Sequence, residues 1–193
     1  MFEIPLAAIG VRTLAPAPVP GAELADAHLA ALDAAARDEP VLAGGVSFGA
    51  HLAAEWALRN PDRCAGLVLA MPAWHGEPGD APAARSALLS ASQVRDLGVD
   101  GALTGVAATA PAWLADELGR AWPRYGDGLA GSLALAAARP APTLAELGAL
   151  GVPVGIATCV DDPIHPADEA RAWARAIPRA AVCATRLEVV GLD

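Results

Sequence analysis

The sequence predicts an α/β fold built on a mostly parallel sheet, and two observations carry this prediction. First, apolar runs alternate along the chain with stretches of helical periodicity, which requires crossover connections and parallel strands. Second, the run CAGLVLAM over residues 64–71 is continuously apolar, without alternation of polar residues. This pattern is typical of a strand that is covered on both faces.

The first half of the chain predicts two further strands and two helices. A short strand over residues 11–15 opens into a proline-rich segment, because proline cannot continue a hydrogen-bonded ladder. Leucines spaced among alanines predict a helix over residues 22–38. The strand at residues 41–46 leads into a helix over residues 50–59, and the Asn-Pro pair that follows ends it.

The second half begins with a break in this alternation. No strong strand is found between about residues 78 and 145, where the helical patterns cover 83–97, 112–122 and 129–139. These segments predict an inserted helical layer rather than another strand-helix unit. Alternation resumes with a strand over 152–160, a helix over 167–177 and a last strand over 181–190.

Length and composition favour a single globular domain over residues 1–193. The chain is 54% hydrophobic, and its net charge of -9 argues against binding to nucleic acids or anionic membranes. No run approaches the ~20 apolar residues that span a bilayer, and the N-terminal segment lacks the features of a signal peptide, so we expect a cytoplasmic protein. The three cysteines, Cys64, Cys159 and Cys183, are expected to be buried free thiols, and no spacing suggests a metal site.

The pentapeptide GVSFG, residues 45–49, lies directly between the strand at 41–46 and the helix at 50–59. In this context Ser47 is a candidate nucleophile, because a sharp strand-to-helix turn projects its hydroxyl from the sheet edge. The backbone N–H of Phe48 would then face the oxyanion that forms on attack. The alternative is that Ser47 merely caps the helix.

Three segments of the chain resemble the α/β-hydrolase family. They are GVSFG, the following apolar CAGLVLAMPAW, and VPVGIATCVDDPIHPADEARAWARAIP. In the last segment a strand runs into a loop that looks like the acid loop of the family. The resemblance covers residues 11–190.

The resemblance implies a site and a subdivision of the chain. Ser47 would be the nucleophile, Phe48 an oxyanion donor, and Asp162 the catalytic acid, with Asp161 as the fallback. The fold would have helices on both faces of the sheet, with a core over residues 1–77 and 146–193 and a helical lid over about 78–145. Such an enzyme needs neither cofactor nor metal.

The chain departs from the family in two places. Nothing before residue 11 resembles the loop that supplies the second oxyanion amide, and no histidine follows the last strand, where the family carries its base. His75, at the carboxyl edge of the sheet, and His165, in the acid loop, are the possible bases. His51 is expected one helical turn beyond Ser47 with its ring pointing away from the base position, and His28 is expected within the first helix.

Two functions are consistent with these observations. The first is a serine hydrolase that acts on a carboxylic ester or thioester of a small-molecule acyl substrate. The alternative is a catalytically degenerate hydrolase fold that binds a small apolar ligand or a protein partner.

Two further expectations concern the chain as a whole. The chain could be part of a longer product. An uncovered sheet edge would favour self-association into a homo-oligomer.

Overall fold

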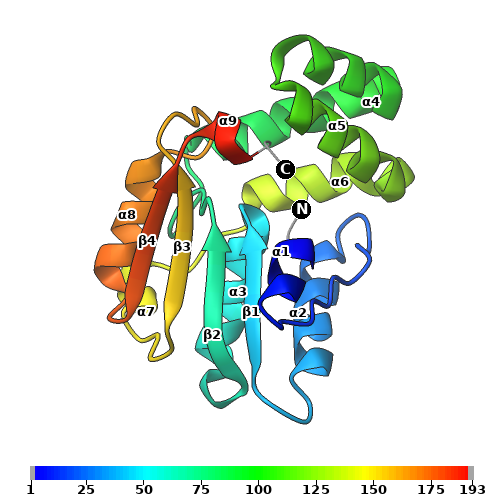
Figure 1. Cartoon of the computed structure of the whole chain (residues 1–193). Helices are drawn as coiled ribbons and strands as arrows, with labels where there is room; N and C mark the ends of the chain where they lie inside the picture. The colour runs from blue at the N-terminus through cyan, green and yellow to red at the C-terminus, as the bar shows by residue number, and fades with distance from the viewer. Residues whose placement is uncertain (1–2, 191–193) are drawn as a thin grey trace.

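The computed structural model describes residues 3–190, and the side chains of residues 6–190. In this part of the chain the core is a four-stranded, wholly parallel sheet (Figure 1). Its strands lie in the order β1-β2-β3-β4, with every strand next to its neighbour in sequence. The bounds are β1, Val41–Val46; β2, Cys64–Ala70; β3, Val154–Cys159; and β4, Ala180–Thr185.

Two of the helices that connect the strands in sequence pack against the sheet. Helix α3 contacts β1 and β2, and α8 contacts β3 and β4. Their buried residues form one apolar cluster with inward-facing strand residues such as Leu67, Leu69 and Ile156. The helices outside the insertion are α1, Glu3–Ala8; α2, Leu24–Ala35; α3, Phe48–Arg59; η1, Pro61–Arg63; α7, Leu144–Leu147; α8, Ala167–Ala176; and α9, Leu187–Val190.

The helical insertion between β2 and β3 lies above the carboxyl ends of the strands in Figure 1. A positive φ of 72° at Gly98 kinks its longest helix, and the outer part of the insertion has an apolar cluster of its own around Val94, Trp122 and Leu129. The elements are α4, Pro82–Thr109; α5, Ala112–Ala121; η2, Trp122–Gly128; and α6, Leu129–Ala138. The prediction of a helical layer here is therefore confirmed, and its action as a lid stays a prediction.

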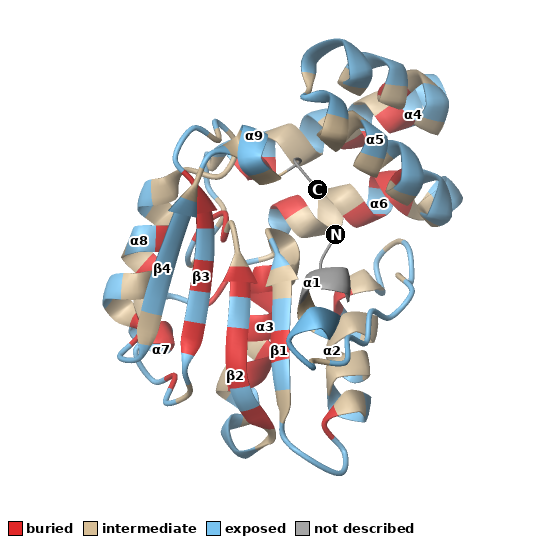
Figure 2. Ribbon diagram, viewed as in Figure 1, coloured by how far each residue is buried: buried red, intermediate tan, exposed pale blue. Residues whose placement is uncertain are grey.

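The α/β class and the parallel sheet are also confirmed, and the two faces of the sheet differ in exposure. In the described part of the chain, α3 and α8 lie on the same face. The other face presents Leu42, Val46 and Val68, which are 51%, 38% and 48% exposed (Figure 2). Because parallel sheets are normally covered on both faces, this exposure is unusual for the fold.

Two predicted strands differ from the structure. Residues 11–15 have no regular secondary structure, and the prolines that follow carry no N–H with which to continue a ladder. The last strand ends at Thr185 and is followed by α9, because the N–H of Leu187 donates to Asp161 Oδ1 (2.7 Å) and the backbone leaves the sheet.

The cysteines also differ in part from expectation. Cys64 and Cys159 are buried free thiols as predicted, whereas Cys183 is free but exposed. Cys183 lies on β4, whose outer edge has no neighbouring strand in the described sheet, so the prediction of burial was wrong there. Within residues 3–190, no helix combines the length and the apolarity needed to cross a membrane.

Candidate active site

The turn between β1 and α3 places Ser47 in a strained backbone conformation at the carboxyl edge of the sheet. Its φ is 54° and its ψ is -116°, a region that non-glycine residues rarely occupy. Its N–H donates to the carbonyl of Ala70 on β2 (2.9 Å), which anchors the turn to the neighbouring strand. Such strain costs about 1–3 kcal/mol and concentrates at functional sites.

Gly45, two residues before Ser47, is required to be a glycine by close packing. A Cβ at Gly45 would lie 2.3 Å from the backbone carbon of Gly49, so any larger residue would force the turn open. At Gly49 itself, by contrast, a Cβ would meet no atom within 4 Å. The close approach of strand and helix is therefore carried by Gly45.

Ser47 does not use its hydroxyl to cap α3. No side-chain capping bond forms, and its carbonyl instead accepts from the N–H groups of Ala50 (2.9 Å) and His51 (3.3 Å). Phe48 is the first residue of the helix, so its N–H belongs to the first turn, which has no intrahelical acceptors. The capping alternative for Ser47 thus has no support, and its hydroxyl is available to another partner.

The loop between β3 and α8 folds around the carboxylate of Asp162. Oδ1 accepts from the backbone N–H groups of Ile164 (2.7 Å) and His165 (3.2 Å), and Oδ2 lies 2.9 Å from His165 Nδ1. Burial by itself raises the pKa of Asp162, but the hydrogen bonds from His165 and Ile164 outweigh it and lower the pKa below its usual value. Asp162 is therefore ionised near neutral pH.

His165 connects this carboxylate to Ser47. Its Nε2 lies 2.9 Å from Ser47 Oγ, on the opposite side of the ring from the bond to Asp162. An ionised carboxylate only accepts hydrogen bonds, so Nδ1 of His165 carries the proton. Nε2 is then the acceptor for the Ser47 hydroxyl, which is the arrangement of a nucleophile, a general base and an orienting acid.

The structure separates the other candidates from this arrangement. His75 Nδ1 lies 2.7 Å from Glu169 Oε1, and Asp161 accepts from Leu187 and lies 3.4 Å from Arg186. Of the two possible bases, the structure brings His165 to Ser47 and directs His75 to a glutamate on α8. Of the two possible acids, it brings Asp162 to the imidazole and directs Asp161 to the start of α9.

The sequence contained a signal for this geometry in the spacing Asp162-x-x-His165. Three residues of a tight turn bring an imidazole back onto the preceding carboxylate, as they do here with 2.9 Å between Nδ1 and Oδ2. What the sequence could not provide was the direction of Nε2. The family pattern instead suggested a base after the last strand.

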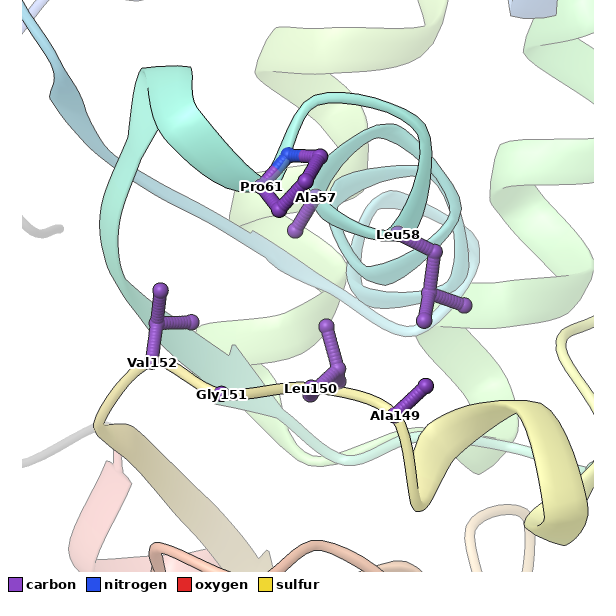
Figure 3. A pocket seen from close by; sticks show the side chains of 7 residues that line it. All are labelled: Ala57, Leu58, Pro61, Ala149, Leu150, Gly151 and Val152. Atoms are coloured by element: carbon purple, nitrogen blue, oxygen red, sulfur yellow. The ribbon is translucent and has the colours of Figure 1, made fainter.

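No metal site accompanies the candidate active site in the described residues, where no group of three or more His, Cys, Asp or Glu side chains is arranged to hold an ion. A small apolar pocket of about 260 Å³ lies elsewhere, between the end of α3 and the segment before β3. This is the amino end of the strands, away from Ser47. Its lining residues are Ala57, Leu58, Pro61, Ala149, Leu150, Gly151 and Val152 (Figure 3).

Comparison with known proteins places the fold. No family model matches the chain, and neither does any curated protein. Among solved structures, an esterase from Thermogutta terrifontis with bound malate superposes with a TM-score of 0.63 at 21% identity, over 90% of this chain and 66% of the esterase. An enol-lactonase from Burkholderia xenovorans gives 0.63 at 19% identity, over 89% and 66%.

A structure from a study of carboxylesterases of Nitrososphaera gargenis gives a TM-score of 0.73 at 13% identity, over 96% of this chain and 75% of that one. The chain thus spans slightly less than two thirds of the esterase and the lactonase. At these identities the likeness concerns the fold. The chain has the α/β-hydrolase fold, as the resemblance in its sequence predicted.

Proposed function

We propose that the protein is a serine hydrolase that cleaves a carboxylic ester or thioester of a small acyl substrate. The observation that carries this proposal is the continuous hydrogen-bonded chain from Ser47 Oγ through His165 to Asp162, with 2.9 Å at each step. A serine with a positive φ between a strand and a helix, within an α/β-hydrolase fold, supports the same reading.

The proposed reaction has two halves. Ser47 Oγ attacks the acyl carbon while His165 Nε2 takes its proton, and Asp162 stabilises the imidazolium. The N–H of Phe48 donates to the oxyanion, whose collapse expels the alcohol or thiol with the proton from His165. Water then attacks the acyl-Ser47 ester, again with His165 as base, and releases the carboxylic acid. No cofactor takes part in this scheme.

The base in this proposal comes from the same loop as the acid. Both residues precede α8 and are separated by three positions, so one loop conformation orients both. This removes the need for a histidine after β4. The proposed triad therefore rests entirely on residues of the described chain.

A fluorophosphonate probe tests the proposal directly, since it reacts with an activated serine without needing the natural substrate. We expect the wild-type chain to be labelled, Ser47→Ala to be unlabelled, and His165→Gln to react at least ~10³-fold more slowly. An authentic serine esterase serves as the positive control. Failure of the wild-type chain to react alongside that control would favour the non-catalytic alternative, a fold that binds a ligand or partner.

A second assay separates the two leaving-group classes. A 4-nitrophenyl ester and an acyl thioester of matched chain length are each supplied to the wild-type chain, with Ser47→Ala as the blank. The ratio of the two kcat/KM values reports the preference. The cytoplasmic location and the self-association expected from the sequence remain predictions. Light scattering over a range of concentrations tests the second of them.

A further inference from the structure

Behind the proposed triad, five side chains form a cluster that joins three segments of the chain, with His51, Trp74 and Trp173 buried and His75 exposed at its edge. The segments are α3, the loop that follows β2, and α8. We call this cluster the clamp. It consists of His51, Trp74, His75, Glu169 and Trp173.

His51 holds the loop after β2 through its ring nitrogen. Nε2 lies 3.0 Å from the N–H of Ala73 and 3.4 Å from the N–H of Trp74, and accepts from both. The side chain is 2% exposed, and burial, followed by the nearby charge of His165, lowers the pKa of His51 to about 3. His51 is therefore neutral, with its Nε2 lone pair fully used as an acceptor, and takes no part as a base.

The same ring contacts two indoles. Trp74 lies edge-on at 4.7 Å between centroids, and Trp173 of α8 lies nearly parallel at 5.7 Å with an interplanar angle of 25°. Aromatic pairs in such geometries stabilise the fold beyond the effect of the area they bury. His51 thus connects α3 directly to α8.

Glu169 completes the clamp from the other side. Its Oε1 accepts from Trp173 Nε1 (2.9 Å) and lies 2.7 Å from His75 Nδ1. Because His75 directly follows Trp74, the loop after β2 is held at two points: by His51 through its backbone, and by Glu169 through its side chain. The glutamate also fixes the rotamer of the indole that stacks on His51.

The position of the clamp links it to the proposed reaction. His51 lies one helical turn beyond Ser47 on α3, whereas Glu169 lies one turn beyond His165 on α8. The two helices that begin within two residues of the nucleophile and the base are thus tied to one another. The clamp joins these two segments through the contact of His51 with Trp173. Among the hydrogen bonds of the described residues, only the one between Ser47 and His165 joins them directly.

We infer that His51, Glu169 and Trp173 are positioning residues that hold the loop carrying His165 against Ser47. The inference rests on the proposed function, since its purpose is to keep the base within hydrogen-bond reach of the nucleophile. A shift of about 1 Å in such a contact can slow a reaction roughly 10²-fold, although the mutated residue never touches the substrate. Loss of the clamp is therefore expected to lower reactivity out of proportion to stability.

The chain offers a matched pair of tryptophans for the test. Trp173 and Trp56 are both fully buried, and each Nε1 donates to a carboxylate: Glu169 in the first case (2.9 Å) and Asp33 in the second (3.2 Å). Replacement by phenylalanine removes the same atoms and the same type of hydrogen bond at both sites. Only Trp173 stacks on His51, whereas Trp56 lies more than two turns along α3 from Ser47.

The experiment compares Trp173→Phe and Trp56→Phe by three measurements on the full chain. Urea unfolding reports stability, and the rate of fluorophosphonate labelling reports the reactivity of Ser47. The low-field proton resonance of the His165–Asp162 hydrogen bond, assigned by its loss in His165→Gln, reports the geometry of the loop. We expect similar losses of stability, a 10- to 100-fold slower labelling of Trp173→Phe alone, and loss or broadening of the resonance in that variant alone.

Equal labelling rates and equal spectra in the two variants would overturn the inference. Glu169→Met, which keeps the length of the side chain but can make neither hydrogen bond, repeats the test if Trp173→Phe does not fold, and the same slowing and broadening are expected. If the wild-type chain itself is not labelled, the proposed function is wrong. The proton resonance then still decides whether the clamp holds His165 in place.

Discussion

His165 Nε2 lies 2.9 Å from Ser47 Oγ, although 118 positions separate the two residues along the chain. The contact arises because β1 and β3 flank β2 in a parallel sheet, so the loops after β1 and β3 leave the same edge about 10 Å apart. A serine side chain and an imidazole together span most of that gap. The strand order thus brings the proposed nucleophile and base together.

The two adjacent aspartates of the acid loop provide the first prediction. Asp162→Asn is expected to lower kcat about 10⁴-fold, because an amide at this position favours the wrong tautomer of His165. Asp161→Asn is the matched control. Its oxygen accepts from the N–H of Leu187, a bond that an asparagine can also make, so kcat should change by less than a few-fold.

Steady-state kinetics on a 4-nitrophenyl ester checks both values, with circular dichroism to show that each variant is folded. Equal effects of the two substitutions would remove Asp162 from the proposed triad. A large effect of Asp161→Asn alone would assign the acid to the fallback residue.

The parts of the fold that were predictable from the sequence are those coded by local pattern. The strand over residues 41–46 has its predicted bounds, and the runs of apolar residues at β2 and β3 mark strands within one or two residues. The expected cover on both faces of β2 was wrong, since Val68 is 48% exposed. The strand over residues 11–15 was wrong because a strand needs a neighbour to pair with, which short-range pattern does not specify. The same limit applies to the end of β4. There the N–H of Leu187 donates to the side chain of Asp161, a residue distant in sequence, and the backbone leaves the sheet.

The candidate site was predictable to a different extent. Ser47 follows from a turn whose residues are contiguous, and Asp162 follows from its place after a strand. His165 could be given only as one of two possible bases, since its selection depends on a ring orientation set by two hydrogen bonds to Asp162. The clamp had no sequence signal, because its members come from three segments, α3, the loop after β2 and α8, and meet only in the folded chain.

The tight turn before Ser47 provides the second prediction. Gly45→Ala is expected to destabilise the fold by about 1–3 kcal/mol and to slow labelling of Ser47, because its Cβ would overlap the backbone of Gly49. Gly49→Ala is the control from the same pentapeptide. Its Cβ meets nothing within 4 Å and the position is helical, so stability should stay equal or rise by up to about 1 kcal/mol.

Urea unfolding of the two variants beside the wild-type chain measures this difference. The two substitutions add the same methyl group four residues apart, so hydrophobicity and composition cannot account for opposite signs. A Gly45→Ala variant as stable as the wild type would show that the turn can open without cost, and the close packing of Gly45 against Gly49 would not be a requirement of the fold.

The buried imidazole of His51 provides the last prediction, a dependence of stability on pH. The pKa of His51 is lowered to about 3 in the folded chain, first by burial and then by His165, whereas an unfolded histidine titrates near 6.5. Between these values the unfolded chain binds a proton that the folded chain does not, so the free energy of unfolding falls as the pH falls. The contribution is about 1.4 kcal/mol per pH unit below 6.5.

Asp162 contributes in a different window. Its folded pKa is lowered below 3.8, so its contribution to stability is present above that value and is lost only at lower pH. Urea unfolding between pH 7 and pH 5 therefore isolates the histidines. We expect His51→Gln, which retains an acceptor for the loop, to show a shallower slope than the wild-type chain. Parallel slopes would mean that His51 titrates normally and is not held as a neutral acceptor, which would also weaken its assignment to the clamp.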